Sequence, residues 1–313
     1  MIICVSANPA IDKRLRVESL VLGEVNRVRS SEAFAGGKAA HVAMAAKALG
    51  EEVLWVGLLG GETGDEIERQ LSELGIKVVS VRTQSVTRTN LEIIDDGGQI
   101  TEVLEPGGIV DAGELTEFRS ACTEAFEAAE DGTVVVLSGS LPPGVPTDEF
   151  GSLTASARNC GAKVIVDTSG EALTAAIEGC PDLIKPNKSE AEKAADMALS
   201  GEGDALTAMK TLTDRGARSV CLTLGADGLA YWDGQVEPVF VTPPKVDVTS
   251  TVGCGDATVA GLAVAMRRRL DSAATARLAA ACGAANCLAH LPGQIQKKVV
   301  DELIDKVLVR SGQ

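Results

Sequence analysis

Apolar runs of strand length alternate along this chain with segments of helical periodicity, and no other feature limits its fold as much. Strands are expected at residues 2–6, 53–58, 133–137, 164–167, 183–185 and 220–224. Helices are expected at about residues 38–49, 65–74, 112–129, 148–160, 190–199, 204–215, 256–269 and 272–289. This alternation is typical of an α/β protein whose mostly parallel sheet is covered by helices.

Two stretches, 11–34 and 86–105, interrupt the alternation with short β-like pieces and charged residues. A turn is expected at residues 95–98, which read Asp-Asp-Gly-Gly. Periodicity alone identifies both stretches only as irregular insertions. The 313 residues are enough for two domains by length, although a single α/β domain reaches this size.

The composition excludes several classes of protein. Hydrophobic residues make up 45% of the chain but aromatic residues only 3%, so we expect an aliphatic core and few platforms for stacking bases. The formal charge of −15 also argues against nucleic-acid binding. An acidic protein that binds an anion must gather its cations locally, which draws attention to Lys38 and Arg88. Because we find neither a membrane-length apolar run nor a secretory leader, we expect a cytoplasmic protein.

The cysteines are scattered, and no two of them form a Cys-x-x-Cys pair. They lie at positions 4, 122, 160, 180, 221, 254, 282 and 287. Such spacing favours buried, reduced thiols over zinc ligands or a disulfide framework.

The segment 250–256, Ser-Thr-Val-Gly-Cys-Gly-Asp, stands before an Ala- and Val-rich helix. Two glycines around a small residue allow backbone N–H groups to converge at the helix start, where the helix dipole favours an anion. Asp256 would lie in the first turn, where its carboxylate could accept a proton from an attacking hydroxyl. This pairing suits phosphoryl transfer. The competing interpretation is an ordinary Gly turn with Asp256 as a capping acid.

Three further segments support an anion site. Residues 35–43 place a Gly-Gly turn and Lys38 at the start of an apolar helix. In residues 184–190, Pro186 ends a short strand and leaves Asn187 and Glu190 as oxygen ligands for hydrated magnesium. Residues 220–228 form an apolar strand that leads into a Gly-bounded turn able to wrap a nucleotide.

In this order the segments resemble the ribokinase-like (PfkB) family of carbohydrate kinases over nearly the whole chain. The branch that phosphorylates sugar phosphates is matched by further segments, at 8–12, 87–90, 101–102, 105–107, 138–144 and 167–171. The resemblance implies one three-layer α/β/α kinase domain, with a small β-sheet lid formed by residues of about 11–35 and 86–106. The family's lids often pair with a second subunit, so we expect a homodimer.

The resemblance also implies roles for individual residues. Asp256 would be the general base, and the amides of Gly253, Cys254 and Gly255 would stabilise the transferred phosphoryl group. Asp12 would bind sugar hydroxyls, although a cap or turn acid is the alternative. Lys38 and Arg88 would bind the phosphate already on the sugar, with Arg27 as a weaker third candidate. The remaining residues expected around the sugar are Gly36, Gly37, His41, Asn90 and Ser140.

ATP and Mg²⁺ are the cofactors that the resemblance implies. Lys185 and Asn187 would organise the ATP phosphates, while Asn187 and Glu190 would hold magnesium through water. The groove for the nucleotide would be bordered by Thr223, Gly225, Gly228 and Asn286. Asn286 lies on an Ala-rich helix, so a core position is the competing interpretation.

The chain departs from the family pattern at Ala39 and His41, where the family usually has glycine and asparagine. His41 could donate to the sugar or its phosphate, or it could be a packed helix histidine. Cys254 stands where alanine is usual, and its side chain reads as a buried thiol. His290, the chain's other histidine, reads as a loop residue.

The leading hypothesis is an ATP-dependent kinase that converts a ketohexose monophosphate into a bisphosphate. The acceptor could be fructose 1-phosphate, fructose 6-phosphate or tagatose 6-phosphate. One alternative is a kinase for a free sugar or nucleoside, which would share Asp256 but not require Lys38 and Arg88 together. The other is a non-catalytic regulator that binds nucleotides or sugar phosphates.

Overall fold

A ten-stranded sheet forms the centre of the computed structural model, which describes residues 1–311. From edge to edge its strands are β14 (Leu308–Ser311), β13 (Val239–Thr242), β12 (Leu229–Trp232), β11 (Val220–Thr223), β10 (Leu183–Ile184), β9 (Lys163–Asp167), β8 (Val134–Ser138), β1 (Ile2–Ser6), β4 (Val53–Leu59) and β5 (Lys77–Arg82). In this spatial order, every pair of neighbouring strands from β11 through to β5 is parallel. The pairs β11–β12, β12–β13 and β13–β14 are antiparallel. The mostly parallel sheet expected from the sequence is confirmed.

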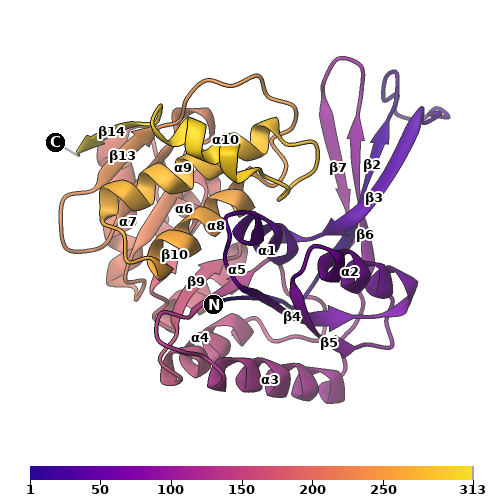
Figure 1. Ribbon diagram of the computed structural model, residues 1–313, viewed down its shortest axis with the longest axis horizontal. Coiled ribbons are helices and arrows are strands. Elements are labelled where there is room, and N and C mark those ends of the chain that lie inside the picture. Colours follow the sequence, from indigo (N-terminus) through magenta and orange to yellow (C-terminus); the bar gives the residue numbers. More distant parts are fainter. Residues whose placement is uncertain (312–313) are drawn as a thin grey trace.

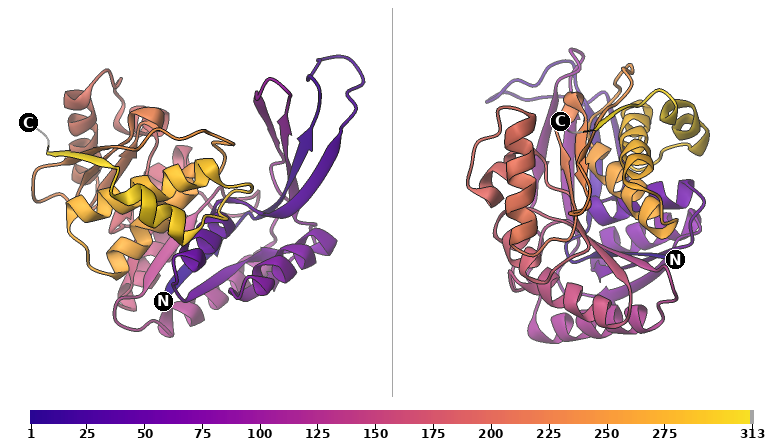
Figure 2. Two further views of the ribbon diagram at one scale, coloured as in Figure 1. Left: turned by 45° about the horizontal axis from the view of Figure 1, so that its top comes forward. Right: turned by 90° about the vertical axis from the view of Figure 1, so that its left-hand side faces the viewer.

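Helices cover both faces of this sheet, as the right-hand view of Figure 2 shows. On one face lie α1 (Lys38–Ala48), α2 (Gly61–Glu73), α8 (Cys254–Arg267), α9 (Ser272–Leu288) and α10 (Lys297–Ile304). On the other lie α3 (Ala112–Glu127), α4 (Glu149–Asn159), α5 (Gly170–Glu178), α6 (Lys188–Ala195) and α7 (Glu202–Asp214). A short 3₁₀ turn, η1, spans Gly225–Asp227. No helix within residues 1–311 has the length and apolar character needed to cross a membrane.

The two stretches that interrupt the alternation form a separate four-stranded sheet, which projects from the body in Figure 1. Its order is β3 (Ser30–Gly36), β2 (Ala10–Arg16), β6 (Arg88–Ile94) and β7 (Ile100–Leu104). Strands β2 and β6 are parallel and pair Ala10 with Arg88, Asp12 with Asn90 and Arg14 with Glu92. Because side chains alternate along a strand, these six residues lie on one face of the small sheet. We call this sheet the lid.

Apolar runs become buried central strands for a simple reason. β1 and β8 lie between neighbours on both sides and carry helices on both faces, so all five residues of each strand are buried. The core that results is mainly aliphatic and forms one cluster on each face of the sheet. This confirms the expectation from the low aromatic content.

Several elements lie outside the sequence prediction: α5, α10, β5, β12, β13 and β14. The strands among them are short or carry charges, and they lie at or near the sheet edges, where packing on neighbours rather than periodicity stabilises them. Helix α6 ends at Ala195, before the expected residue 199, because Asp196 adopts a left-handed conformation with φ 54°. The expectation that the thiols are buried was wrong for Cys180, which is exposed.

Helices α8 and α9 pack unusually close together because small residues face each other along their contact. A Cβ atom on Gly261 would lie 2.9 Å from the Cα of Ala279, and one on Gly283 would lie 2.7 Å from the Thr258 hydroxyl. Both distances are too short for real side chains. The two glycines therefore set the separation of these helices.

We expect Gly261→Ala to lower the free energy of unfolding by up to ~2 kcal/mol. The gain of about 1 kcal/mol in helix propensity is outweighed by overpacking, which costs roughly 1–3 kcal/mol. Gly203→Ala in α7 is the matched control, since a Cβ there meets nothing within 4 Å. It should leave stability unchanged or raise it by up to ~1 kcal/mol. Urea unfolding measures both, and a fully stable Gly261→Ala protein would contradict the close packing.

Candidate active site

A cavity of about 1190 Å³ opens between the lid and the carboxyl ends of the parallel strands. Ligands bind at this edge in open α/β sheets. Most residues singled out in the sequence line it: Asp12, Gly37, Lys38, His41, Arg88, Asn90, Ser140, Lys185, Asn187, Glu190, Thr223, Gly225, Gly228, Gly253, Cys254, Gly255 and Asp256. Gly36 and Asn286 do not line it, and Arg27 is an exposed lid residue.

The start of α8 supplies backbone N–H groups to the cavity. Gly253 caps the helix with φ 78°, and a Cβ at this position would lie 2.7 Å from Pro292. Within residues 1–311 the amides of Gly253 and Gly255 have no hydrogen-bond acceptor, as is usual in a first helical turn. The Cys254 amide, by contrast, donates to the Thr251 carbonyl at 3.2 Å. Of the three predicted anion-binding amides, two are therefore free.

His41 lies between two carboxylates. Its Nδ1 is 2.8 Å from Asp256 Oδ2, and its Nε2 is 3.2 Å from Asp12 Oδ2, at ion-pair distance but outside hydrogen-bonding geometry. Burial alone would lower the pKa of His41, but the two carboxylates outweigh it and raise the pKa to about 10. The imidazolium form is thus the stable one at neutral pH, and it separates two like charges.

Asp12 owes its position to two glycines and to the lid register. A Cβ on Gly36 would lie 2.1 Å from the Asp12 Cγ, so only glycine leaves room for this carboxylate. Gly37 adopts φ 80°, and its amide lies 3.4 Å from Asp12 Oδ2. Asn90, the register partner of Asp12, donates to Oδ1 at 2.9 Å. Gly36 therefore shapes the site without lining it.

Asp167 is a site residue to which the sequence analysis assigned no role. It ends strand β9, is buried, and lies 3.2 Å from the Lys185 ammonium and 3.4 Å from that of Lys38. Burial favours the neutral acid, but the two lysines outweigh it and lower the pKa of Asp167. The sequence did contain a signal for this residue. Asp167 is an acid at the end of an expected buried strand, and the next expected strand along the chain leads to Lys185.

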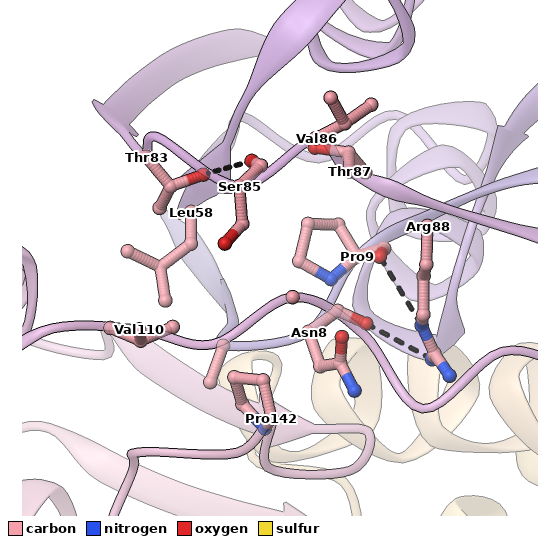
Figure 3. A pocket seen from close by; sticks show the side chains of 12 residues that line it. Asn8, Pro9, Leu58, Thr83, Ser85, Val86, Thr87, Arg88, Val110 and Pro142 are labelled. Atoms are coloured by element: carbon pink, nitrogen blue, oxygen red, sulfur yellow. Dashed lines mark hydrogen bonds between the residues drawn. The ribbon is translucent and has the colours of Figure 1, made fainter.

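Arg88 is held by backbone carbonyl groups, as Figure 3 shows for Asn8 and Pro9. Its guanidinium donates to the carbonyls of Pro9, Asn8 and Glu105 at 3.4, 3.1 and 2.6 Å. Of its five N–H groups, about two stay available for a phosphate. Ser140 lies near it and accepts a hydrogen bond from the Asn8 amide at 3.0 Å.

A buried ion pair ties the lid to the start of α8. Arg14 Nε donates to Glu92 Oε2 at 2.8 Å, and Ser250 donates to Glu92 Oε1 at 3.1 Å. Arg14 also donates to the carbonyl of His290. Both members of the pair are buried, and the lid register places them opposite each other. The sequence analysis did not identify this pair, because nothing in the sequence says that the two segments are adjacent.

The region predicted to bind the nucleotide lies beyond Lys185. Asn187 and Glu190 form a capping box at the start of α6, in which each side chain accepts from the other's backbone N–H at 2.8–2.9 Å. Their remaining oxygen lone pairs fit a hydrated Mg²⁺ bound through water. Thr223 bridges to Asn187, and Gly225 and Gly228 take φ 63° and 103° in the following turn.

Asn286 occupies a core position, which was the competing interpretation of the sequence, rather than a place in the nucleotide groove. It is buried, and its amide donates to the Val252 carbonyl at 2.8 Å while its oxygen accepts from the Gly293 amide at 2.8 Å. Asn286 therefore joins the α8 loop to residues 291–293 rather than facing the nucleotide groove. The α9 residues that line the cavity are Ala280, Gly283, Ala284 and Cys287.

The charge of His41 predicts a pH dependence of stability. A group whose pKa rises on folding contributes its full stability below its unfolded value of about 6.5 and loses it as the pH rises through about 10. The stability of the wild type relative to His41→Asn should therefore fall between these values. Urea unfolding across this range measures it. The exposed His290→Asn variant is the control and should change stability by less than ~0.5 kcal/mol. A flat difference for His41→Asn would contradict the imidazolium.

Comparison with known proteins agrees with this geometry. Residues 2–298 match the model of the pfkB family of carbohydrate kinases. The 1-phosphofructokinase of Rhodobacter capsulatus is 37% identical over 278 residues, which cover 88% of this chain and 87% of that protein. The 1-phosphofructokinase of Escherichia coli strain K12 is 34% identical over 280 residues, covering 90% and 88%.

Solved structures show the same likeness. Phosphofructokinase-2 from Escherichia coli in complex with fructose-6-phosphate superposes with a TM-score of 0.89 at 26% identity, covering 97% of this chain and 98% of that one. The site geometry and the extent of these matches lead to one conclusion: the chain belongs to the pfkB family of carbohydrate kinases.

Proposed function

We propose that the protein transfers the γ-phosphoryl group of ATP to a hydroxyl of a ketohexose monophosphate and forms a bisphosphate, with Asp256 as the general base. One observation carries this proposal. Asp256 and the free amides of Gly253 and Gly255 lie in one turn at the start of α8 and open on the cavity. A base and an anion hole that share one helical turn suit the attack of a hydroxyl on a phosphoryl group.

The acceptor is expected to carry hydroxyl groups close to Asp12. Within residues 1–311 the buried side-chain atoms without a hydrogen-bond partner are His41 Nε2, Trp55 Nε1 and Asn90 Oδ1. Two of these atoms belong to residues that line the cavity and contact Asp12. Buried polar atoms are normally satisfied, so a polar ligand supplies their missing partners. A sugar offers both a donor and an acceptor in each hydroxyl.

Lys38 and Arg88 support an acceptor that already carries a phosphate. Both line the cavity, and an acidic protein that gathers two cations at one cavity is suited to an anionic ligand rather than to a neutral sugar. Because the curated relatives are 1-phosphofructokinases, fructose 1-phosphate is the first acceptor to test, ahead of fructose 6-phosphate and tagatose 6-phosphate.

In the proposed reaction the chain orients the base and stabilises the negative charge that develops on the transferred phosphoryl group. His41 holds Asp256 by Oδ2 and leaves Oδ1 to accept the proton of the attacking hydroxyl, a contribution of about 10²–10⁴ in rate. The amides of Gly253 and Gly255, together with Lys185, face the developing negative charge. Magnesium held through water near Asn187 and Glu190 would neutralise phosphate charge.

Asp256→Asn should abolish turnover and leave ATP affinity within a few fold of the wild type. The amide keeps the shape of the turn but cannot accept the hydroxyl proton. Coupled ADP release and ATP titration measure the two quantities. Asp214→Asn, which changes an exposed acid in α7, is the control and should retain full activity. An Asp256→Asn enzyme with near-normal turnover would refute the proposed base.

Lys38→Ala and Arg88→Ala should each lower kcat/KM for the sugar phosphate by at least about tenfold, while KM for ATP barely changes. A cation about 4 Å from a phosphate interacts by roughly 4 kcal/mol at an effective dielectric near 20, before screening reduces it. Lys210→Ala on the surface of α7 is the control. Because Arg88 also holds three carbonyls, Arg88→Lys and urea unfolding must accompany it. An Arg88→Ala enzyme of normal stability and efficiency would favour a free-sugar kinase.

Removal of divalent metal should abolish activity, because Lys185 and the two free amides are expected to neutralise too little of the charge on the ATP phosphates. Excess chelator followed by addition of Mg²⁺ tests this, with activity expected to return. Full turnover in chelator would contradict a magnesium-dependent mechanism.

The proposal extends to the chain's organisation, a single kinase domain that acts in the cytoplasm as a homodimer paired through the lid. The lid carries exposed apolar side chains, among them Leu22, Val25 and Leu104 at 90%, 83% and 59% exposure. Escherichia coli phosphofructokinase-2 has a tetrameric inhibited form. Sedimentation of the purified protein, compared with a Leu22→Ser Val25→Ser variant, distinguishes a monomer, a dimer paired through the lid and a larger assembly.

A further inference from the structure

Two thiols meet at the edge of the cavity. Cys254 is the first residue of α8 and Cys287 lies in the last turn of α9, and their sulfur atoms are 3.1 Å apart. Both side chains are half-buried, and both line the cavity. Within residues 1–311 no other pair of cysteines is in hydrogen-bond contact.

The packing of α8 against α9 brings these thiols together. The same contact places Gly261 opposite Ala279 and Thr258 opposite Gly283, one turn at a time along two antiparallel helices. Continuing this ladder by one more turn places Cys254 opposite Cys287. Two hydrogen bonds hold the adjoining loop, from the Thr249 amide to the Cys287 carbonyl at 2.7 Å and from Asn286 to the Val252 carbonyl. The thiols are therefore held next to each other by the fold.

The two sulfurs have different chemistry. With Cys254 as the donor, its S–H stabilises the thiolate of Cys287, which lowers the pKa of Cys287 and raises that of Cys254. A thiolate is the reactive form of cysteine, so Cys287 is the nucleophile of the pair. By contrast, burial raises the pKa of Cys4, Cys122 and Cys282, which makes those thiols inert.

We propose that Cys254 and Cys287 form a reversible disulfide when the protein meets hydrogen peroxide, and that this bond displaces the amides at the start of α8. The Cys287 thiolate attacks one peroxide oxygen, the O–O bond breaks, and a sulfenic acid and one water form once the leaving oxygen is protonated. The Cys254 sulfur then attacks the Cys287 sulfur, the S–O bond breaks, and a second water leaves. The two thiols lose two electrons and two protons, and the peroxide is reduced to water.

The consequence for the site follows from distance. A disulfide has an S–S bond of about 2.05 Å, so the sulfurs must approach by about 1 Å. Cys254 lies between Gly253 and Gly255, whose free amides form the proposed anion hole. A shift of about 1 Å in reacting geometry can cost roughly 100-fold in rate. We therefore expect the oxidised protein to lose most of its turnover.

The bond itself is tested without reference to activity. The reduced protein is treated with hydrogen peroxide, its remaining thiols are blocked, and its peptides are compared by mass spectrometry with and without a thiol reductant. We expect one cross-linked pair that contains Cys254 and Cys287 and that separates on reduction. If both cysteines instead remain free, or pair with others, the proposal is overturned.

Variants connect the bond to its effect. Each enzyme's turnover after peroxide is divided by its own turnover when reduced, so that differences in basal activity cancel. The ratio should fall at least about tenfold in the wild type and in Cys180→Ser, which lacks the exposed thiol, and should recover with reductant. It should stay near one in Cys287→Ala and in Cys254→Ala.

Each outcome bears on a separate claim. A Cys287→Ala enzyme that loses turnover to peroxide as the wild type does would overturn the role of the pair. A wild type that forms the disulfide and keeps its turnover would overturn the effect on α8. The mass measurement stands even if the sugar-phosphate substrate proves wrong, which separates this inference from the proposed function.

Discussion

The first turn of α1 places two cations among the buried carboxylates of the site, and the arrangement of the rest of the cavity depends on these ion pairs. Three buried carboxylates, Asp12, Asp167 and Asp256, come from different segments, and each would be costly to bury alone. Lys38 pairs with Asp167, while His41, three residues later on the same helical face, lies between the other two. Gly36 and Gly37 allow α1 to begin this close to Asp12. One helical turn thus joins the lid strand, the sheet edge and the proposed base.

The contact of α8 with α9 sets the opposite wall. Gly261 and Gly283 allow the two helices to approach closely, which fixes the start of α8 relative to the end of α9. Asn286 and the Arg14–Glu92 pair then connect this start to a loop and to the lid. The same closeness that positions the free amides also places Cys254 beside Cys287. The position of the proposed anion hole and that of the proposed disulfide therefore have one structural origin.

Much of the fold could be predicted because local pattern and tertiary structure agree. Continuous apolar runs such as Ile2–Ser6 become central parallel strands, and the Gly-rich turns fall at strand ends, where a parallel sheet binds ligands. The short edge strands and α5 were not predicted, since a few residues of weak propensity are stabilised mainly by their neighbours. For Asn286 the sequence left the nucleotide groove and the core both open, because an asparagine on an Ala-rich helix carries no signal of which face it occupies.

By itself, then, the sequence determined the α/β class, the order of the elements and the residue types available for chemistry, since these follow from periodicity and from local turn preferences. Only the tertiary structure decided the partners. It placed His41 between Asp12 and Asp256, and it made Asp167 the partner of two lysines. It also directed three N–H groups of Arg88 to backbone carbonyls and brought Cys254 next to Cys287. The physical reason is that these contacts join segments far apart in the chain, so their geometry depends on how helices and sheets pack, which no local pattern specifies.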